Sequence, residues 1–319
     1  MLAKITVIIA GALMLPLAAR AQADYPSKPV RIMVASTAGG PLDIVTRNAA
    51  NWWQKQWGQA FIVENKPGAS GIIAVDAVMR EAPDGYTLLS TTSGISATLA
   101  GMKSAPYSVT RDFAPVGIIC GGGVLLTTST TLPVKTIEAL VQYVKSNPGK
   151  INFGEPGVLS ADVEDLFSRL GIRDNIVHVR YKGGGPAQAA ALSGEVHLIL
   201  GQESLVKNNP EKVRAIAYTG GARYPGLPDV PTIAETVLPG YRYTAWLGFL
   251  ARAGVPMTIL RKLNGELLEF QKTPTALAAA RNLNFADDVA LDVESMRQLI
   301  LGEAKKMDEL VARGIIVRE

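Results

Sequence analysis

The chain has little of the chemistry on which disulfide, thiol-redox and metal proteins depend. Its 319 residues include one cysteine, Cys120, and two histidines, His178 and His197. A single cysteine cannot form an internal disulfide, a CxxC redox pair or a zinc site with several thiolate ligands. Two histidines argue against a multi-histidine metal site. We therefore expect no metal and no cofactor.

Charge is also sparse. The 32 Lys and Arg residues exceed the 28 Asp and Glu residues by only four, and no basic cluster with interleaved aromatics is present. This argues against a nucleic-acid-binding protein. Hydrophobic residues make up 48% of the chain and charged residues 19%, which indicates a folded core rather than disorder. The length predicts about two domains.

Signatures of common enzymes are missing as well. Ala69-Ser70-Gly71 does not complete a GxSxG nucleophile elbow, and the chain contains no HExxH. His178 and His197 each lie in a short apolar run typical of a strand, where a structural role is the simpler interpretation. We expect no enzyme activity.

The first 23 residues resemble a secretory signal. Lys4 supplies the positive start, Ile5–Leu17 the apolar stretch, and Ala21-Gln22-Ala23 the small-x-small cleavage pattern. The alternative is a membrane anchor, but the apolar stretch is shorter than the roughly 20 residues needed to span a bilayer. Because Cys120 is the only cysteine, no lipid can be attached at the cleavage point. We expect cleavage near Ala23 and a free periplasmic protein.

Strand-like and helix-like segments alternate along the rest of the chain. Val30–Val34 is a short apolar run, a helix is expected from Pro41 to Trp57, and Phe61–Glu64 is the next predicted strand. The same alternation continues through the middle third, which indicates an α/β chain with mostly parallel sheets. A strand predicted late, at Ala245–Leu250, suggests that the chain returns to its first unit. We expect two lobes, residues 24–122 with 226–319 and residues 123–225, with glycines 121–123 at a crossing.

Two loops between predicted strands and helices could hold an anion. Ser36–Asp43 and Tyr181–Pro186 each contain glycines, which let a ligand approach the backbone closely, and each precedes a helix whose free amides attract negative charge. The alternatives are tight turns and a solvated Lys182. For Asp43, stabilisation of the first helical turn is the more economical role. The hydroxyls of Thr91-Thr92-Ser93 could donate to an anion or cap the next segment.

Eight strings, taken in order, resemble the substrate-binding proteins of tripartite tricarboxylate transporters, the TctC or Bug family. Each string is weak alone, but the eight lie in register over nearly the whole chain after residue 24. They are Tyr25-Pro26-Ser27-Lys28-Pro29, Gly39-Gly40 with Asp43, Val63-Glu64-Asn65-Lys66-Pro67-Gly68, Ala82-Pro83-Asp84-Gly85-Tyr86-Thr87, Asn147-Pro148-Gly149-Lys150, Ile176-Val177-His178-Val179, Tyr181-Lys182-Gly183-Gly184 and Leu227-Pro228-Asp229-Val230-Pro231-Thr232.

This resemblance implies a type II periplasmic-binding-protein fold, in which two α/β lobes close on a ligand at a hinge. It implies a monomer that captures a small organic acid, a dicarboxylate or an aromatic carboxylate, and delivers it to the membrane permease of a tripartite tricarboxylate transporter. The ligand contacts implied by position are Thr37, Ala38, Gly39, Gly40, Asp43, Thr92 and Ser93 in the first lobe and Ser160, Lys182, Gly183, Gly184 and Gln202 in the second.

Three departures from the family pattern bear on specificity. Ser36-Thr37-Ala38 replaces an aromatic residue followed by prolines, the loop Pro156–Ala161 is shorter and lacks a histidine, and Gln202 stands where an aspartate is usual. The identity of the ligand therefore cannot be inferred from relatives. Two other classes of function stay open. The protein could be a periplasmic sensor that binds the same solute and docks on a signalling receptor, or an enzyme on the same fold.

Overall fold

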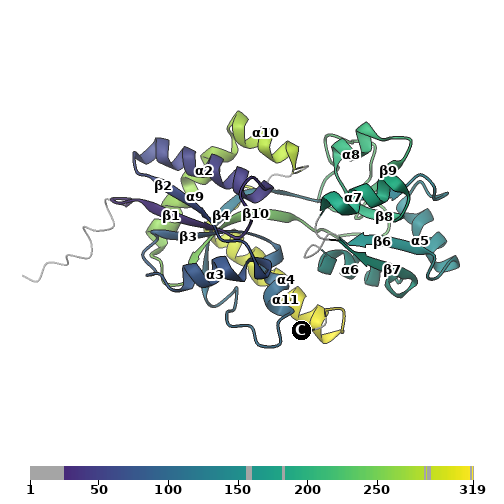
Figure 1. The fold of residues 1–319 in the computed structure, drawn as a ribbon, viewed down its shortest axis with the longest axis horizontal. Coiled ribbons are helices and arrows are strands. Elements are labelled where there is room, and N and C mark those ends of the chain that lie inside the picture. Colours follow the sequence, from purple (N-terminus) through teal and green to yellow (C-terminus); the bar gives the residue numbers. More distant parts are fainter. Residues whose placement is uncertain are drawn as a thin grey trace, which may run out of the picture.

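The computed structural model describes residues 25–155, 160–181, 184–283, 285, 289–316 and 318. These residues form two α/β lobes side by side along the long axis of the molecule (Figure 1). The α/β architecture with two lobes predicted from the sequence is confirmed. Among the described residues, no helix is both long and apolar enough to cross a membrane.

The first lobe is built on a five-stranded sheet in the order β2-β1-β3-β10-β4. The strands are β1 (Val30–Val34), β2 (Phe61–Asn65), β3 (Thr87–Thr92), β4 (Phe113–Gly122) and β10 (Ala245–Arg252). β1, β2 and β3 are parallel, whereas β10 lies antiparallel between β3 and β4. The late strand expected from the sequence therefore does return to the first lobe.

Helices cover both faces of this sheet (Figure 1). On one face lie α2 (Pro41–Trp57), α9 (Met257–Gln271) and α10 (Pro274–Asn282), and on the other α3 (Ile72–Met79), α4 (Gly94–Ala100) and α11 (Val293–Ala312). A short 3-10 turn, η1 (Ala69–Gly71), precedes α3. Trp53 of α2 is fully buried and donates its indole N–H to the Leu263 carbonyl at 3.2 Å. This bond joins α2 to α9 across the core.

The second lobe has its own five-stranded sheet in the order β7-β6-β8-β5-β9. The strands are β5 (Leu125–Ser129), β6 (Ile151–Glu155), β7 (Ile176–Arg180), β8 (Leu198–Gly201) and β9 (Val213–Tyr218), and the helices are α5 (Ile137–Ser146), α6 (Ser160–Arg169), η2 (Arg173–Asn175), α7 (Gly184–Ser193) and α8 (Glu203–Asn208). As the sequence suggests, Thr136 caps α5, its hydroxyl accepting from the Ala139 amide at 3.2 Å.

The return to the first lobe comes later than the boundary predicted at residue 226. Ile233 and Tyr241 are buried in the core of the second sheet, and Thr232 forms a bridge with Tyr218 of β9. The segment 226–243 therefore belongs with the second lobe, and the chain crosses back near Thr244. Residues 220–231, rich in Gly and Pro, are followed by apolar side chains, and these are buried against the second sheet.

The crossing strands determine the direction of every other strand. β4 runs toward the second lobe because β5 follows it directly, and β10 is antiparallel to β4. β3, with its parallel neighbours β1 and β2, is antiparallel to β10 and so also runs toward the second lobe. In the second sheet β8 is antiparallel to β5, and β6 and β7 run with β8. The carboxyl ends of β1, β2, β3, β6, β7 and β8 thus all point toward the region between the lobes.

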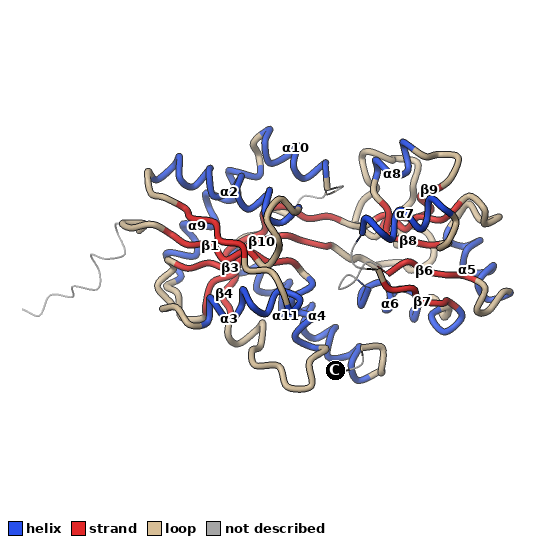
Figure 2. The backbone as a smooth tube through the Cα atoms, viewed as in Figure 1, coloured by secondary structure: helices blue, strands red, loops and turns tan. Residues whose placement is uncertain are grey.

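Figure 2 shows the chain running between the two lobes at the crossing. Two glycines there are closely packed. A Cβ atom on Gly123 would lie 2.2 Å from the Gly220 backbone nitrogen and 2.7 Å from Cζ of Tyr218. A Cβ atom on Gly121 would lie 2.7 Å from the Ala245 carbonyl oxygen. Glycine at these positions lets the outgoing and returning strands approach each other.

We predict that Gly123→Ala lowers the free energy of unfolding by about 1–3 kcal/mol, because the added methyl group overpacks the crossing. The matched control is Gly265→Ala in α9, where a Cβ atom would meet nothing within 4 Å. Alanine there should raise stability by about 0.5–1 kcal/mol through helix propensity. Urea unfolding measures both changes, and equal effects of the two substitutions would contradict the packing argument.

Candidate functional site

The loop between β1 and α2 presents backbone to solvent at the carboxyl end of β1. Thr37, Ala38 and Gly39 are exposed. Gly40 is the N-cap of α2 and offers no side chain to the helix, while Pro41 occupies the first turn and has no N–H. Gly39 has a φ of +77°, a conformation that favours glycine. An uncapped helix start of this kind attracts an anion.

Asp43 holds this loop in shape. Its side chain is only 4% exposed, and its carboxylate accepts from the Gly39 amide at 2.8 Å, from Nε of Arg47 at 3.0 Å and from the Asn65 side-chain amide at 2.9 Å. Asn65 also donates to the Ser36 carbonyl at 3.2 Å. The carboxylate therefore points into its own loop, and Asp43 positions the loop backbone.

The pKa of Asp43 reflects these contacts. Burial by itself raises the pKa of a carboxyl group, but the hydrogen bonds from Arg47, Gly39 and Asn65 together outweigh burial and hold the pKa of Asp43 below its usual value. Because the folded-state pKa is depressed, the stabilisation is present above the unfolded-state pKa and is lost as the pH falls through the folded-state value. Asn65 and Arg47 were not singled out from the sequence. A buried acid four residues before an arginine on one helix was the available signal.

At the carboxyl end of β3, the two predicted hydroxyl contacts have different environments. Thr92 is half-buried and its hydroxyl accepts from the Gly94 amide at 3.2 Å, the capping alternative considered above. Ser93 is buried, and its amide donates to the Trp246 carbonyl at 3.0 Å while its hydroxyl accepts from the Trp246 amide at 3.4 Å. Ser93 thereby ties β3 to β10 beside the crossing.

The second-lobe candidates come from the ends of three neighbouring strands. Ser160 begins α6 after β6, Gly184 begins α7 after β7, and Gln202 precedes α8 directly after β8. Gln202 is half-buried and makes no side-chain cap bond to α8. Lys182, Gly183 and the loop 156–159 lie outside the described residues. The described candidates of both lobes thus lie at strand ends directed at the interlobe region.

Charged and polar groups near this edge are mostly paired. Glu155, the last residue of β6, is buried, and its carboxylate lies 3.4 Å from Nε of Arg180 at the end of β7. Nδ1 of His178 lies 2.7 Å from the Glu164 carboxylate, and Nδ1 of His197 accepts from the Asn152 amide at 3.0 Å. Both histidines therefore have the structural surroundings expected from the sequence. In the part of the chain that the structure describes, no group of three or more His, Cys, Asp and Glu side chains could hold a metal ion.

The family model described as "Tripartite tricarboxylate transporter family receptor" matches residues 45–314. The chain belongs to this family. A protein from an intergenic region of Agrobacterium vitis is 33% identical to this receptor over 96% of its length and 90% of the relative's. BugT from Bordetella pertussis is 32% identical over 88% of this receptor and 86% of BugT. The resemblance stated from the eight strings is therefore confirmed.

Solved structures agree with this membership. The periplasmic binding protein BugD is 29% identical with a TM-score of 0.71, over 92% of this receptor and all of BugD. An R. palustris protein solved with adipate is 28% identical with a TM-score of 0.75, over 92% of this receptor and all of that chain. MatC from Rhodopseudomonas palustris, solved with bound malate, is 28% identical with a TM-score of 0.71, over 90% of this receptor and all of MatC. The receptor thus has a periplasmic-binding-protein fold, and its family comprises solute-binding receptors.

We predict that Asp43→Asn lowers the free energy of unfolding at pH 7 by about 1–3 kcal/mol, because the charged acceptor of three hydrogen bonds is lost. The difference from wild type should begin to shrink as the pH falls below about 4, where Asp43 of the unfolded chain starts to bind a proton, and should shrink further as the pH approaches the lower pKa of the folded protein. Urea unfolding at pH 7 and pH 3.5 measures this difference. A difference that stays constant between the two pH values would show that the charge of Asp43 does not hold the loop.

Proposed function

We propose that this receptor binds a small organic carboxylate between its lobes in the periplasm and delivers it to the permease of a tripartite tricarboxylate transporter. The observation that supports this most is the convergence of strand ends. The α2 start after β1, and the α6 and α7 starts after β6 and β7, come from different lobes and are directed at the same region. Helix starts of both lobes can then hold one anion each.

Recognition rests on the backbone in this proposal. At the first lobe the contacts are Thr37, Ala38, Gly39 and Gly40, with the half-buried Thr92 beside them. Asp43 and Ser93 were both expected to contact the ligand. In this proposal they act indirectly: Asp43 holds the β1–α2 loop, and Ser93 holds the end of β3 against β10. At the second lobe we propose Ser160, Lys182, Gly183, Gly184 and Gln202. Amide donors suit a carboxylate because charge-assisted hydrogen bonds are stronger than neutral ones. Since the Gly39 and Gly40 amides donate within the loop, we assign the donor role there to Thr37 and Ala38, and the two glycines let the ligand approach.

A dicarboxylate is the substrate class that fits two facing anion sites best. Structures similar to this receptor have been solved with adipate and with malate, both of which carry two carboxyl groups. The three loop departures noted above distinguish this chain from its relatives, so its own acid can differ in length and polarity. Residues 1–23 serve as the export signal in this account, with cleavage near Ala23.

Binding would act through lobe closure. A ligand that contacts both lobes favours the closed arrangement because only there does it make both sets of contacts. The chain crosses between the lobes at β4–β5 and at the start of β10, so we propose that closure bends the chain at these crossings. The ligand leaves unchanged, since its role is transfer to the permease.

The test is a thermal-shift panel of mono-, di- and aromatic carboxylates against the purified mature protein. An acid present at 100 times its Kd should stabilise the fold by about 2.7 kcal/mol and raise the melting temperature. Neutral sugars of similar size serve as the control ligands. If no acid in the panel raises the melting temperature, the proposed ligand class is wrong.

We predict that Gly40→Val abolishes the shift given by any active acid. A Cβ atom at residue 40 would lie 3.3 Å from the Thr37 carbonyl oxygen, and the larger side chain would also cover the amides of the α2 start. The control is Gly265→Val on α9, where a Cβ atom would meet nothing within 4 Å. Isothermal titration calorimetry measures both, and unchanged affinity in Gly40→Val would remove this loop from the binding site.

A further inference from the structure

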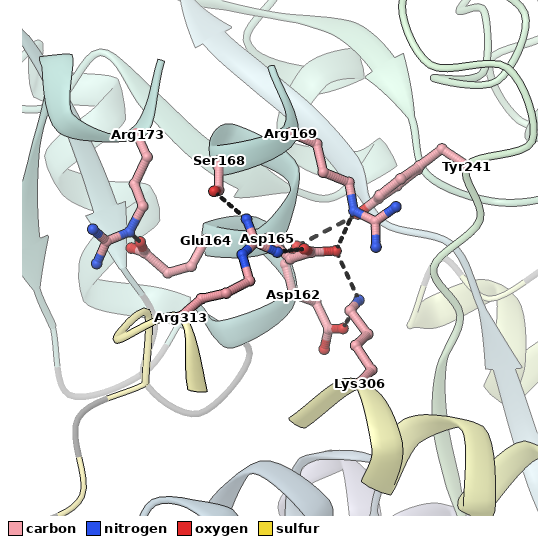
Figure 3. Close-up of polar contacts among 9 residues, drawn as sticks. All are labelled: Asp162, Glu164, Asp165, Ser168, Arg169, Arg173, Tyr241, Lys306 and Arg313. Atoms are coloured by element: carbon pink, nitrogen blue, oxygen red, sulfur yellow. Dashed lines mark hydrogen bonds and ion pairs between the residues drawn. The ribbon is translucent and has the colours of Figure 1, made fainter. Parts of the chain in front are cut away.

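The two lobes are joined a third time, at a place where the chain does not cross. α11 belongs to the first lobe, yet it contacts α6 of the second. Figure 3 shows Lys306 projecting from α11 toward the acidic side chains of α6. Lys306 Nζ lies 2.5 Å from Asp162 Oδ1 and 3.5 Å from Asp165 Oδ2.

A second cation of α11 contacts the same helix. Nη1 of Arg313 lies 3.3 Å from Asp165 Oδ1, and Nη2 donates to the Ser168 hydroxyl at 2.6 Å. Residues 306 and 313 are seven apart, and residues 162, 165 and 168 are three apart, so each set lies along one face of its helix. We call Asp162, Asp165, Lys306 and Arg313 the α6–α11 ion cluster.

The cluster is more buried than an ordinary surface ion pair. The side chain of Asp165 is 1% exposed, and those of Asp162 and Lys306 are 16% and 22% exposed. Within the second lobe, Nε of Arg169 on α6 lies 2.8 Å from Asp165 Oδ2. Separating α6 from α11 would break the ion pairs of Asp162 and Asp165 with Lys306 and Arg313 and hydrate their charges. Replacing Lys306 alone would leave Asp162 packed against α11 without its partner, which is strongly unfavourable.

Space for movement lies beside the cluster. A cavity of about 380 Å³ is lined by both lobes, with Ser93 and Glu303 from the first and Asp162 and Tyr243 from the second. Lys306 forms part of this lining, 5.6 Å from the centre of the Tyr243 ring. Because residues of both lobes line this cavity beside the cluster, its shape changes when one lobe turns against the other.

We propose that the α6–α11 ion cluster is a third inter-lobe connection that sets the resting width of the ligand cleft. That the region between the lobes is a ligand cleft rests on the proposed function. Charge holds the spacing of α6 and α11 at one place, and the strand crossings join the lobes at another, so together these connections restrict how the lobes rotate. A weaker cluster would let the unliganded lobes sample more arrangements, which changes the fraction ready to bind.

The experiment measures the lobe spacing without any ligand, by pulsed electron paramagnetic resonance between two spin labels. Cys120 is the only native cysteine and is buried, and Cys120→Ala gives a background free of native thiols. Ile44→Cys on α2 and Ala189→Cys on α7 place labels at exposed positions of the two lobes. A second pair, Asp308→Cys and Asp174→Cys, reports on the cluster itself from exposed positions on α11 and η2.

We expect Lys306→Met to broaden both distance distributions relative to the labelled parent, and Arg313→Met to broaden them less. Lys305→Met is the matched control, because Lys305 is the exposed neighbour on the same helix. Circular dichroism verifies that each variant folds. If Lys306→Met does not fold, the test rests on Arg313→Met, because the Arg313 side chain is 45% exposed and its replacement disturbs the packing less.

Distributions that superimpose on the parent in Lys306→Met and Arg313→Met would overturn the proposal. So would equal broadening in Lys305→Met, because the effect would then not come from the cluster. Since no ligand is used, the result is independent of the carboxylate panel. A negative panel with broadened distances would refute the ligand class alone and leave the cluster as a lobe connection.

Discussion

The antiparallel pairing of β10 with both β3 and β4 is the constraint on which the rest of the structure depends. β4 leaves the first lobe and β10 returns to it, so their pairing fixes the direction of every strand in that sheet. β5 does the same in the second sheet through its pairing with β8. Glycines at 121 and 123 allow the close approach that this arrangement requires. Without these pairings, the helix starts of the two lobes would have no common direction.

Polar groups near the interlobe region divide into those that position backbone and those that join the lobes. Asp43 and Asn65 hold the β1–α2 loop, and Ser93 ties β3 to the returning strand. The α6–α11 ion cluster joins the lobes where no strand crosses. The overall charge of the chain has little part in either, because each effect comes from local amides or from pairs within hydrogen-bonding distance.

Much of the fold could be predicted from the sequence because amphipathic and buried segments alternate clearly. α2 begins at Pro41 and ends before Gly58, whose φ of +66° is the cap that glycine favours. β4 was not predicted as a strand, because all ten of its residues are buried and the run contains Pro115 and Gly117, so it shows neither alternation nor a helical period. The boundary at residue 226 was predicted too early. The apolar residues Ile233 and Tyr241 that follow it pack on the second sheet, a contact that no local sequence pattern shows.

The candidate site was predictable in part. Junctions of strand, glycine and helix identified the candidate loops, and the family resemblance supplied the individual contact residues. Which of these side chains bond to the protein itself could not be predicted, because their partners are distant in sequence. Asp43 meets Asn65 from the next strand, and Ser93 meets Trp246 from the far end of the chain. The cation partners of Asp162 and Asp165 are Lys306 and Arg313, more than 140 residues later in the chain, so no local pattern could pair them.

The most direct test of the central claim is mass-spectrometric identification of the small molecules that the protein enriches from a metabolite extract. The mature protein is incubated with the extract, separated by gel filtration and denatured to release what it holds, with Gly40→Val treated in parallel. We predict enrichment of a carboxylic acid by wild type and its loss in Gly40→Val. Enrichment of a compound without a carboxyl group, or equal enrichment by both proteins, would contradict the account.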